Sequence, residues 1–593
     1  MIFATNTNIF KLVSFYFTMK DNLISFLKES LEFELDFDKI LEKPKVASYG
    51  DWSMPCFLLS KELGKNPAEI AKELADKLSR NRPEFLEIIT AVGPFINFHF
   101  NKIQEAKDVL RDVFEKSIFD VKVEIPQKVL LEYPSPNTNK SLHIGHVRNM
   151  LIGNSLTKIL KKTGNEVIKT NMNNDRGIAI CKSMLGYELF FKDKTPESLG
   201  LKPDDFVAKC YVEFGNQAKK NPDMKLDEKA QNMLVKWEAG DKEIRDLWKK
   251  VMKWVFDGYK ETYESFKING YDIEFFFFFF YDKGKDIVLN ALENNVKGFV
   301  KGDDGAVFCD LEDVGYDKKY LLRGDGTTLY MTQDLYLAQV KEEKFNPDMS
   351  VFIVGREQEY HFQVLFEILE RLGFGGNDKN YHFSYGYVYN KDGKKFSSRK
   401  GEVVGADWLV NEAKKKAYDN LLTKEISKNL DEEELKRRSV IISYAALAFS
   451  ILRVNPKDDT NFDLDRALAF EGETGPYVQY TYARIQSILK KSDISVDLDV
   501  DYNVFGEKEI TLIKLLKEYK NIIDEASSKY KISAIANYLI KICKAFNDFY
   551  QNCSILKADT KEQKKARLLL AKSTADMIKD CLELLDIEVL EEM

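Results

Sequence analysis

The stretch LLEYPSPNTNKSLHIGHVRNMLIGNSLTKILKKTG, residues 130–164, decides the fold. An apolar run that ends at Tyr133 predicts a buried strand, and the Pro- and Asn-rich segment after it predicts a loop. Apolar residues then recur at helical spacing, and Gly164 follows them, as in a helix that ends on a left-handed residue. A second strand candidate begins at Glu166. Such a strand-loop-helix-strand unit turns the N-terminus of its helix toward the carboxyl ends of the strands, where anions bind.

His143 and His146 lie where this loop becomes the helix. At a spacing of three, both imidazoles can face the same side of the first turn, and Gly145 leaves space between them. A phosphate chain bound there would meet two imidazoles, backbone N–H groups and the positive end of the helix dipole. Histidines near a helix start can also be simple caps. The chain has only five histidines, however, and two of them lie on this turn, which favours a nucleotide site.

The HIGH tetrapeptide, residues 143–146, resembles the first signature of class I aminoacyl-tRNA synthetases. The longer string SPNTNKSLHIGHVRN resembles the arginyl-tRNA synthetase version of that signature. In this family the two histidines stabilise the transition state in which the amino-acid carboxylate attacks the α-phosphate of ATP and pyrophosphate leaves. The resemblance implies this catalytic role for His143 and His146, with Gly145 in the same ATP-binding turn. It also implies a Rossmann-like, doubly wound α/β catalytic domain.

The loop KKFSSRKGEVV, residues 394–404, resembles the second class I signature, usually written KMSKS. Hydroxyls and cations suit a loop that closes over a triphosphate, although a basic loop is also typical of a solvated surface. Ser398 stands where the signature has its second lysine. Many relatives with this loss carry a lysine just before HIGH, as Lys140 does here. The further residues expected to contact ATP or to neutralise pyrophosphate are Lys140, Lys395, Ser397, Ser398 and Lys400.

A pocket that selects arginine needs carboxylates, neutral acceptors and an aromatic face, because a guanidinium is a flat, permanently charged fork of donors. The resemblance assigns Tyr330 and Asp334 to the guanidinium and Asn137 to the backbone of the amino acid. It assigns Glu132 and Gln358 to the polar ends of the substrate. Taken singly, each of these residues is more typical of a surface or capping group, so the prediction depends on all of them together.

Residues 1–125 are predicted to form a small N-terminal α/β domain, and residues 1–18 are a possible extension before a start at Met19. The string GPFINF resembles the motif with which the family's N-terminal domain contacts the tRNA elbow. The resemblance implies that Phe95 stacks on a splayed base while Asn97 bonds its edge. A phenylalanine in a strand is also a common core residue.

Residues 126–405 are the predicted catalytic domain, with a charged, Trp-containing helical insertion at about residues 191–268 that should pack as long helices. Within this domain a helix after the Gly-Asp-Gly turn is predicted to be capped at Thr332. The run from Phe275 to Phe280 cannot alternate between two faces of a strand. It should therefore be buried on both faces or promote aggregation.

Residues 406–593 are predicted to form an all-α helical bundle. Its string FDLDRALAFEGETGPYVQYTYARI resembles the anticodon-binding domain of arginyl-tRNA synthetases. Aromatic residues at helical spacing usually belong to the core. The resemblance implies instead that anticodon bases stack on a surface that contains Tyr477, Tyr480, Tyr550 and Met593.

Size and composition narrow the class of protein. A chain of 593 residues with 44% hydrophobic and 31% charged residues suits a globular protein of two to four domains. The net charge of −7 argues against indiscriminate polyanion binding, so any RNA contact should be local. Seven cysteines without a C-x-x-C pair indicate a reducing compartment and neither a disulfide framework nor a zinc or other protein-bound metal site. No apolar run is long enough to span a membrane, and no basic region begins a signal peptide, so a cytoplasmic protein is expected.

These features together predict an arginine–tRNA ligase. It would form arginyl-adenylate from L-arginine and Mg²⁺-bound ATP and pass the arginyl group to the 3′-terminal ribose of tRNA(Arg). We expect a monomer with no membrane partner, and the resemblance implies that activation needs bound tRNA. The alternatives are a class I synthetase for another amino acid and a catalytically silent tRNA-binding paralogue.

Overall fold

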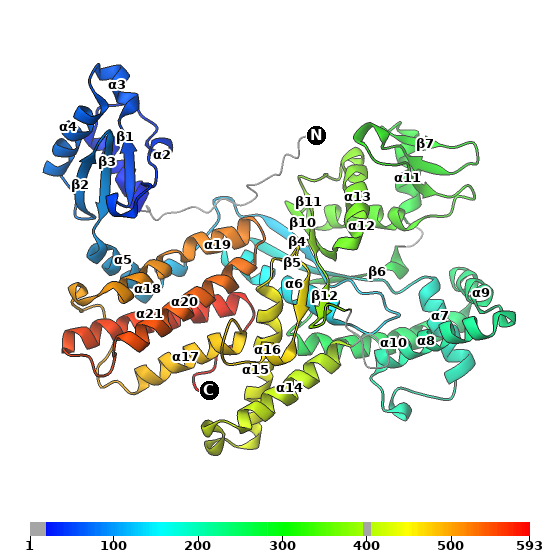
Figure 1. The fold of residues 1–593 in the computed structure, drawn as a ribbon. Helices are drawn as coiled ribbons and strands as arrows, with labels where there is room; N and C mark the ends of the chain where they lie inside the picture. The colour runs from blue at the N-terminus through cyan, green and yellow to red at the C-terminus, as the bar shows by residue number, and fades with distance from the viewer. Residues whose placement is uncertain (1–18, 281–282, 395–404) are drawn as a thin grey trace.

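The computed structural model describes residues 19–280, 283–394 and 405–593, so the predicted extension at residues 1–18 lies outside it. The described chain forms an N-terminal domain, a central α/β domain, which is the predicted catalytic domain, and a helical bundle (Figure 1). In Figure 1 the N-terminal domain stands apart, and helix α5 (Lys102–Phe114) lies between it and the bundle. The predicted fold class is confirmed.

The N-terminal domain is a three-stranded antiparallel sheet, in the order β1-β3-β2, with helices on it. Helix α4 begins as its sequence predicts, because Pro67 occupies the first turn and the Asn66 side chain accepts a hydrogen bond from the backbone N–H of Ala68. The apolar residues of this domain form a core cluster of their own. Its elements are α1 (Met19–Ser30), α2 (Phe37–Ile40), β1 (Trp52–Pro55), α3 (Phe57–Leu63), α4 (Pro67–Arg80), β2 (Leu86–Val92) and β3 (Phe95–Phe100).

The catalytic domain is built on a five-stranded parallel sheet in the order β11-β10-β4-β5-β6. From β4 the chain proceeds outward through β5 and β6, and it later returns to the other side of β4 with β10 and β11. Ligands bind at such a reversal of strand order, outside the carboxyl ends of the strands. The strands are β4 (Lys128–Glu132), β5 (Glu166–Asn173), β6 (Ile273–Phe276), β10 (Met349–Gly355) and β11 (Asn380–Tyr385).

Helices cover both faces of this sheet. Alternate residues of β10 belong to different cores: Val351 and Ile353 pack with α6 (Ile144–Lys162), while Phe352 packs with α12 (Tyr330–Phe345) and α13 (Glu359–Leu372). Burial of both faces explains why β4 and β10 read as continuous apolar runs. The predicted strand-loop-helix-strand unit is therefore β4, α6 and β5.

Two insertions extend the catalytic domain. The first lies between β5 and β6, and its tryptophans pack in aromatic clusters, as Trp237 and Trp248 do with ring centroids 5.6 Å apart. The second carries a three-stranded antiparallel sheet, β7-β8-β9. Their elements are α7 (Ile178–Gly186), α8 (Pro203–Lys220), α9 (Leu226–Glu238), α10 (Lys242–Ser265), α11 (Gly284–Glu293), β7 (Phe299–Lys301), β8 (Val307–Cys309) and β9 (Lys319–Leu322).

Two local predictions in this domain are wrong. The phenylalanine run is not buried on both faces, because β6 ends at Phe276 and a short 3₁₀ helix, Phe277–Phe279, follows it with Phe279 61% exposed. The alternative, that the run promotes aggregation, stays a prediction. Thr332 does not cap α12, which begins two residues earlier; its hydroxyl instead donates to the carbonyl of Leu321 at 2.5 Å. In both cases tertiary contacts override the local pattern.

The C-terminal part is a helical bundle, as predicted. A two-stranded parallel sheet joins β12 (Val388–Asn390) to β13 (Thr460–Phe462). The bundle and α6 share one continuous apolar core. The helices are α14 (Ala406–Leu422), α15 (Glu432–Leu452), α16 (Leu464–Ala467), α17 (Gly475–Lys490), α18 (Glu507–Lys517), α19 (Tyr519–Ser528), α20 (Ser533–Asn552) and α21 (Lys561–Leu584).

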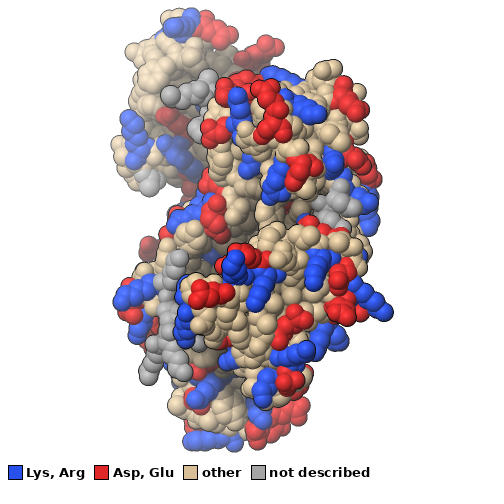
Figure 2. Space-filling view, turned by 90° about the vertical axis from the view of Figure 1, so that its right-hand side faces the viewer, with Lys and Arg blue, Asp and Glu red and all other residues tan. Residues whose placement is uncertain are grey.

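The surface is mixed in charge. Figure 2 shows Lys and Arg interspersed with Asp and Glu over the face that it presents, which agrees with binding through local patches. In the described parts of the chain, no helix has the length and apolar character that a membrane span requires. The same residues contain no cluster of three or more His, Cys, Asp or Glu side chains arranged to hold a metal ion.

Candidate active site and tRNA surface

The two signature histidines cap the N-terminus of α6. The backbone N–H of Gly145 donates to Nδ1 of His143 at 3.1 Å, and the backbone N–H of His143 donates to Nδ1 of His146 at 3.1 Å. The ring centroids lie 4.1 Å apart. Because each Nδ1 is an acceptor, the hydrogen of each neutral imidazole is on Nε2. The two rings therefore present paired Nε2–H donors beside the positive end of the helix.

The surroundings keep both imidazoles neutral. Burial lowers the pKa of His143, and the charge of Lys140 lowers it further while Glu357 opposes the shift. The pKa of His146 falls well below its usual value, first through burial and then through His143 and Lys140. Lys140 itself is exposed, so its ammonium can supply positive charge at the mouth of this turn.

The turn is held from two sides. The hydroxyl of Tyr259 in α10 donates to the carbonyls of Asn137 at 3.0 Å and Lys140 at 2.6 Å, which fixes the loop before α6. Gly405, the first described residue after the second signature, forms a backbone bridge with His143. The chain thus re-enters next to the histidines, while the predicted residues Lys395, Ser397, Ser398 and Lys400 lie outside the described residues.

Arg148, one turn into α6, braces the strand that leads to the second signature. Its guanidinium is fully buried, and burial lowers its pKa to about 10. The terminal nitrogens donate at 2.9–3.4 Å to the carbonyls of Gly386, Tyr387, Asn455, Pro456 and Asp458. These carbonyls flank β12 and β13, so Arg148 joins that small sheet to the histidine-bearing helix.

Part of the predicted arginine site comes together at the N-terminal ends of α12 and α13. Tyr330 and Asp334 are one turn apart on α12, and Tyr330 is 65% exposed. Oδ2 of Asp334 lies 2.9 Å from Nε2 of His361, which is on α13 three residues after Gln358. Gln358 is exposed at the start of α13. Sequence reasoning missed His361, which no motif marked.

Two predicted arginine contacts are placed differently. The amide oxygen of Asn137 accepts a hydrogen bond from Nδ2 of Asn174 at 2.6 Å, at an exposed position. Glu132 is buried, and its carboxylate lies 2.5 Å from Nζ of Lys341 in α12. This ion pair neutralises Glu132 inside the protein, and the predicted contact of Glu132 with arginine stays a prediction.

The two predicted tRNA-contacting residues of the N-terminal domain differ in exposure. Phe95 is half-buried, and its ring meets that of Phe57 edge-on at 5.7 Å. Phe57 is 52% exposed, so this pair of rings reaches the surface. Asn97 is only 2% exposed, which prevents it from bonding a base edge in this conformation. Its Nδ2 has no hydrogen-bond partner among the described residues.

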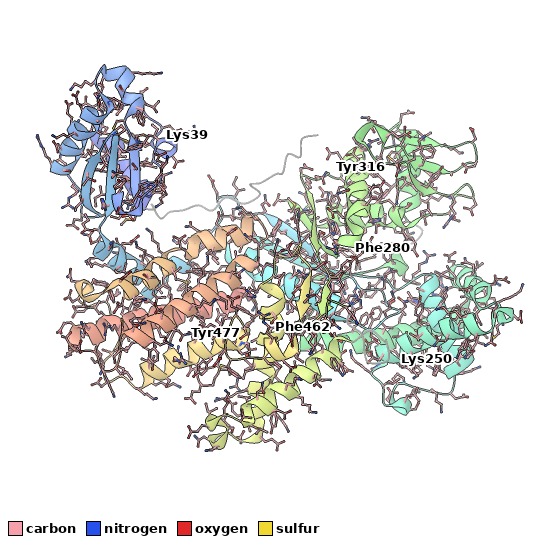
Figure 3. The ribbon with its side chains drawn as sticks, viewed as in Figure 1. Lys39, Lys250, Phe280, Tyr316, Phe462 and Tyr477 are labelled. Atoms are coloured by element: carbon pink, nitrogen blue, oxygen red, sulfur yellow. The ribbon has the colours of Figure 1, made fainter. Side chains whose placement is uncertain are left out.

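The predicted anticodon tyrosines form one connected surface between α17 and α20. The Arg484 guanidinium lies 4.7 Å from the Tyr480 ring centroid and 5.7 Å from that of Tyr550. Arg484 also donates to Asn547 at 2.7 Å, and Asn547 donates to the Tyr477 hydroxyl at 2.8 Å. Figure 3 labels Tyr477 on the bundle, across the central sheet from Phe280 and Tyr316.

Arg484 and Asn547 were not identified from sequence, although Arg484 follows Tyr480 by one helical turn. Met593, the fourth residue of the predicted surface, is half-buried against the large core. The structure therefore brings the three tyrosines together through two polar residues that no aromatic pattern marks.

Comparison with known proteins identifies the family. Residues 109–464 match the model of the class I tRNA synthetase (R) catalytic domain. Residues 18–100 match the arginyl tRNA synthetase N-terminal domain, and residues 478–593 match the DALR anticodon binding domain. The chain belongs to the arginyl-tRNA synthetase family. The predicted family is thereby confirmed.

Individual members of the arginyl-tRNA synthetase family align over most of their length. Arginine–tRNA ligase of Treponema denticola is 38% identical over 576 residues, which cover 94% of this chain and 96% of the relative. That of Parabacteroides distasonis is also 38% identical, over 93% of this chain and 95% of the relative. The solved arginyl-tRNA synthetase of Thermus thermophilus has the same fold, with a TM-score of 0.74, 23% identity and coverage of 97% of this chain and 99% of that chain.

Proposed function

We propose that this synthetase activates L-arginine with ATP and transfers the arginyl group to the terminal ribose of tRNA(Arg). The observation that carries the proposal is the paired, neutral histidine cap of α6 at the reversal of strand order. It lies in a chain that aligns with arginine–tRNA ligases over nearly its full length. ATP is a substrate that the family implies, and Mg²⁺ would arrive bound to it.

In the activation step the arginine carboxylate attacks the α-phosphorus, and the bond to pyrophosphate breaks. Negative charge grows on the phosphoryl oxygens of the transition state. The Nε2–H groups of His143 and His146 donate to those oxygens, and the N-terminus of α6 adds its positive dipole. Because both rings start neutral, net positive charge must come from elsewhere, and Lys140 is the described cation beside them. The roles of Lys395, Ser397, Ser398 and Lys400 stay predictions.

Arginine would bind where Tyr330, Asp334 and Gln358 converge. Asp334 has a carboxylate for the guanidinium, Tyr330 an aromatic face, and Gln358 an amide. His361 holds the carboxylate through one oxygen, which leaves the other oxygen for the substrate. The predicted contact of Asn137 with the backbone of arginine stays a prediction, as does that of Glu132 with arginine.

Two surfaces would hold the tRNA: the ring pair Phe57–Phe95 at the elbow, and the α17–α20 surface at the anticodon. Stacking on aromatic side chains contributes about 1–3 kcal/mol per base. A cytoplasmic location, a monomeric state and tRNA-dependent activation stay predictions.

The test is arginine-dependent ATP–pyrophosphate exchange, followed by charging of tRNA(Arg) with labelled arginine. Arginine should support exchange, whereas lysine and citrulline should not, because a site built for a charged planar fork rejects ligands that leave its polar groups unpaired. Exchange with a different amino acid would identify another class I synthetase. No exchange with any amino acid, with or without tRNA, would indicate a silent tRNA-binding paralogue.

A further inference from the structure

Residues 585–593, here called the C-terminal segment, leave α21 and return to the catalytic domain. Asp586 lies near the start of this segment in a left-handed conformation, with φ at +61°, and only 9% of it is exposed. We propose that Asp586 is a positioning residue that couples the anticodon surface to the ATP site. It would do so by fixing α6, whose first turn carries the two histidines, against the bundle.

The Asp586 carboxylate is shared between two helices. Its Oδ1 lies 2.6 Å from Nζ of Lys158 on α6. Its Oδ2 accepts hydrogen bonds from Nδ2 of Asn154 on α6 at 3.1 Å and from the hydroxyl of Tyr444 on α15 at 3.0 Å. Withdrawal of the carboxylate would remove partners from two buried polar groups, which is costly in free energy. The position of α6 therefore depends on the docked segment.

The same contacts reach the loop in front of the histidines. The Tyr133 hydroxyl, just after β4, donates to Oδ1 of Asn154 at 3.2 Å. The Tyr133 ring lies so close to Gly153 that an added Cβ would come within 2.3 Å of it. A shift of Asn154 would thus displace Tyr133, which begins the loop that ends at His143. Misplacement of catalytic groups by 1 Å can cost roughly a hundredfold in rate.

The same segment also contacts α17, the helix that carries two of the predicted anticodon tyrosines. Gln479, which lies between Tyr477 and Tyr480 on α17, donates from Nε2 to the carbonyl of Glu588 at 2.7 Å. Asp586 and Glu588 are two residues apart. Direct contacts therefore run from the helix that carries the tyrosines, through the segment, to the helix that carries the histidines.

A cavity adjoins the segment on one side. Its volume is about 350 Å³, and its lining includes Lys267, Tyr444 and Glu588. Nζ of Lys267 holds the segment through the carbonyl of Asp586 at 3.2 Å and the carboxylate of Glu588 at 2.8 Å. The segment is therefore held by polar contacts beside this cavity, while Leu585, Ile587 and Leu590 are buried in the large core.

The test rests on the proposed function and begins with charging by the wild-type protein, since failure there overturns the function itself. Asp586→Asn should lower the exchange kcat about tenfold with less than twofold change in KM for ATP or tRNA, because substrate contacts remain while the histidines are misplaced. The full-length variant should melt as one folded species. A wild-type kcat in this variant would overturn the proposal.

Coupling has a separate readout. In the wild type, full-length tRNA(Arg) should support a higher exchange kcat than the same tRNA without its anticodon arm. In Asp586→Asn this ratio should approach one. A ratio equal to that of the wild type, or no difference between the two RNAs in the wild type, would contradict the coupling.

Two further variants complete the design. Lys158→Met, at a partly exposed position, should lower kcat about threefold, and the double variant should be no worse than Asp586→Asn because both act through one contact. If Asp586→Asn does not fold, an unchanged kcat in Lys158→Met overturns the proposal. The matched control is Asp493→Asn, which breaks an ion pair with Lys564 on α21 at a carboxylate that is 79% exposed. An equal loss in this control would also overturn it.

Discussion

At the scale of single residues, the ATP site depends on the absence of one side chain. A Cβ at Gly145 would lie 2.9 Å from Cε1 of His143 and 3.1 Å from its Nδ1. The His143 ring therefore leaves no room for a side chain at Gly145. This reason adds to the one that the sequence suggested, which was space between the two rings.

Gly145→Ala should lower the exchange kcat about 10- to 100-fold, because the His143 ring must rotate away from its donor position. Stability should fall by about 1 kcal/mol, because the rotated ring no longer caps the helix. The control is Gly215→Ala in α8, where an added Cβ meets no atom within 4 Å and should favour the helix. Equal kcat in the two variants would rule out this explanation of the signature.

A second feature at this scale is the buried carboxyl group of Asp204, which lies near the start of α14, the helix that follows the second signature. Asp204 is 1% exposed, and burial raises its pKa to about 7 although Lys202 Nζ lies 3.2 Å away. Lys202 is also 2.7 Å from Asp407 at the start of α14. The folded state therefore binds a proton that the unfolded state releases above pH 3.8.

The sign of this linkage gives a prediction. The stability that Asp204 contributes is present below pH 3.8 and is lost as pH rises through about 7. Asp204→Asn, which stays neutral, should gain about 2–4 kcal/mol in unfolding free energy over the wild type between pH 5 and pH 8. Denaturant titrations at both pH values measure it, with exposed Asp223→Asn as the control. If Asp204→Asn gains unfolding free energy at pH 5 but not at pH 8, the pKa of Asp204 is not raised in the folded state.

At the scale of elements, one guanidinium holds two strands against a helix. The Arg148 guanidinium lies among backbone carbonyls that accept its hydrogen bonds. These carbonyls are 238–310 residues away in sequence. Arg148→Met should cost about 2–4 kcal/mol in unfolding free energy, because it leaves several buried carbonyls without donors. It should also raise KM for ATP, since β12 leads into the second signature. Arg356→Met, a nearby exposed ion-pair arginine, should have a smaller effect on both quantities.

Features that depend on neighbouring residues could be predicted from the sequence, whereas contacts between residues far apart in sequence could not. The unit β4-α6-β5 was predicted because its signals are local: periodicity, a glycine end and a strand after it. The ion pair between Glu132 and Lys341 was not predicted because the two residues are 209 positions apart. His361 was not predicted for a similar reason: only the folded structure brings α13 beside Asp334. Local patterns determine elements, but burial and pairing depend on contacts between elements.

At the scale of the whole molecule, the catalytic domain and the bundle share one apolar core, and the predicted anticodon surface lies between α17 and α20 of the bundle. Arg484 lies against both Tyr480 and Tyr550 and so organises that surface. Arg484→Met should raise KM for tRNA about 5- to 50-fold with little effect on KM for arginine, because roughly one stacked base is lost. Lys491→Met, just past the end of α17, is the control; an equal effect there would indicate general charge rather than stacking.

The N-terminal domain keeps an apolar core of its own, and the ion pair between Glu105 on α5 and Lys517 lies where α5 meets the bundle. Unfolding of residues 19–100 should therefore leave the catalytic domain and the bundle folded. A variant in which this outer domain unfolds would bind tRNA more weakly while its catalytic domain stays folded, so an excess of tRNA would restore its activity.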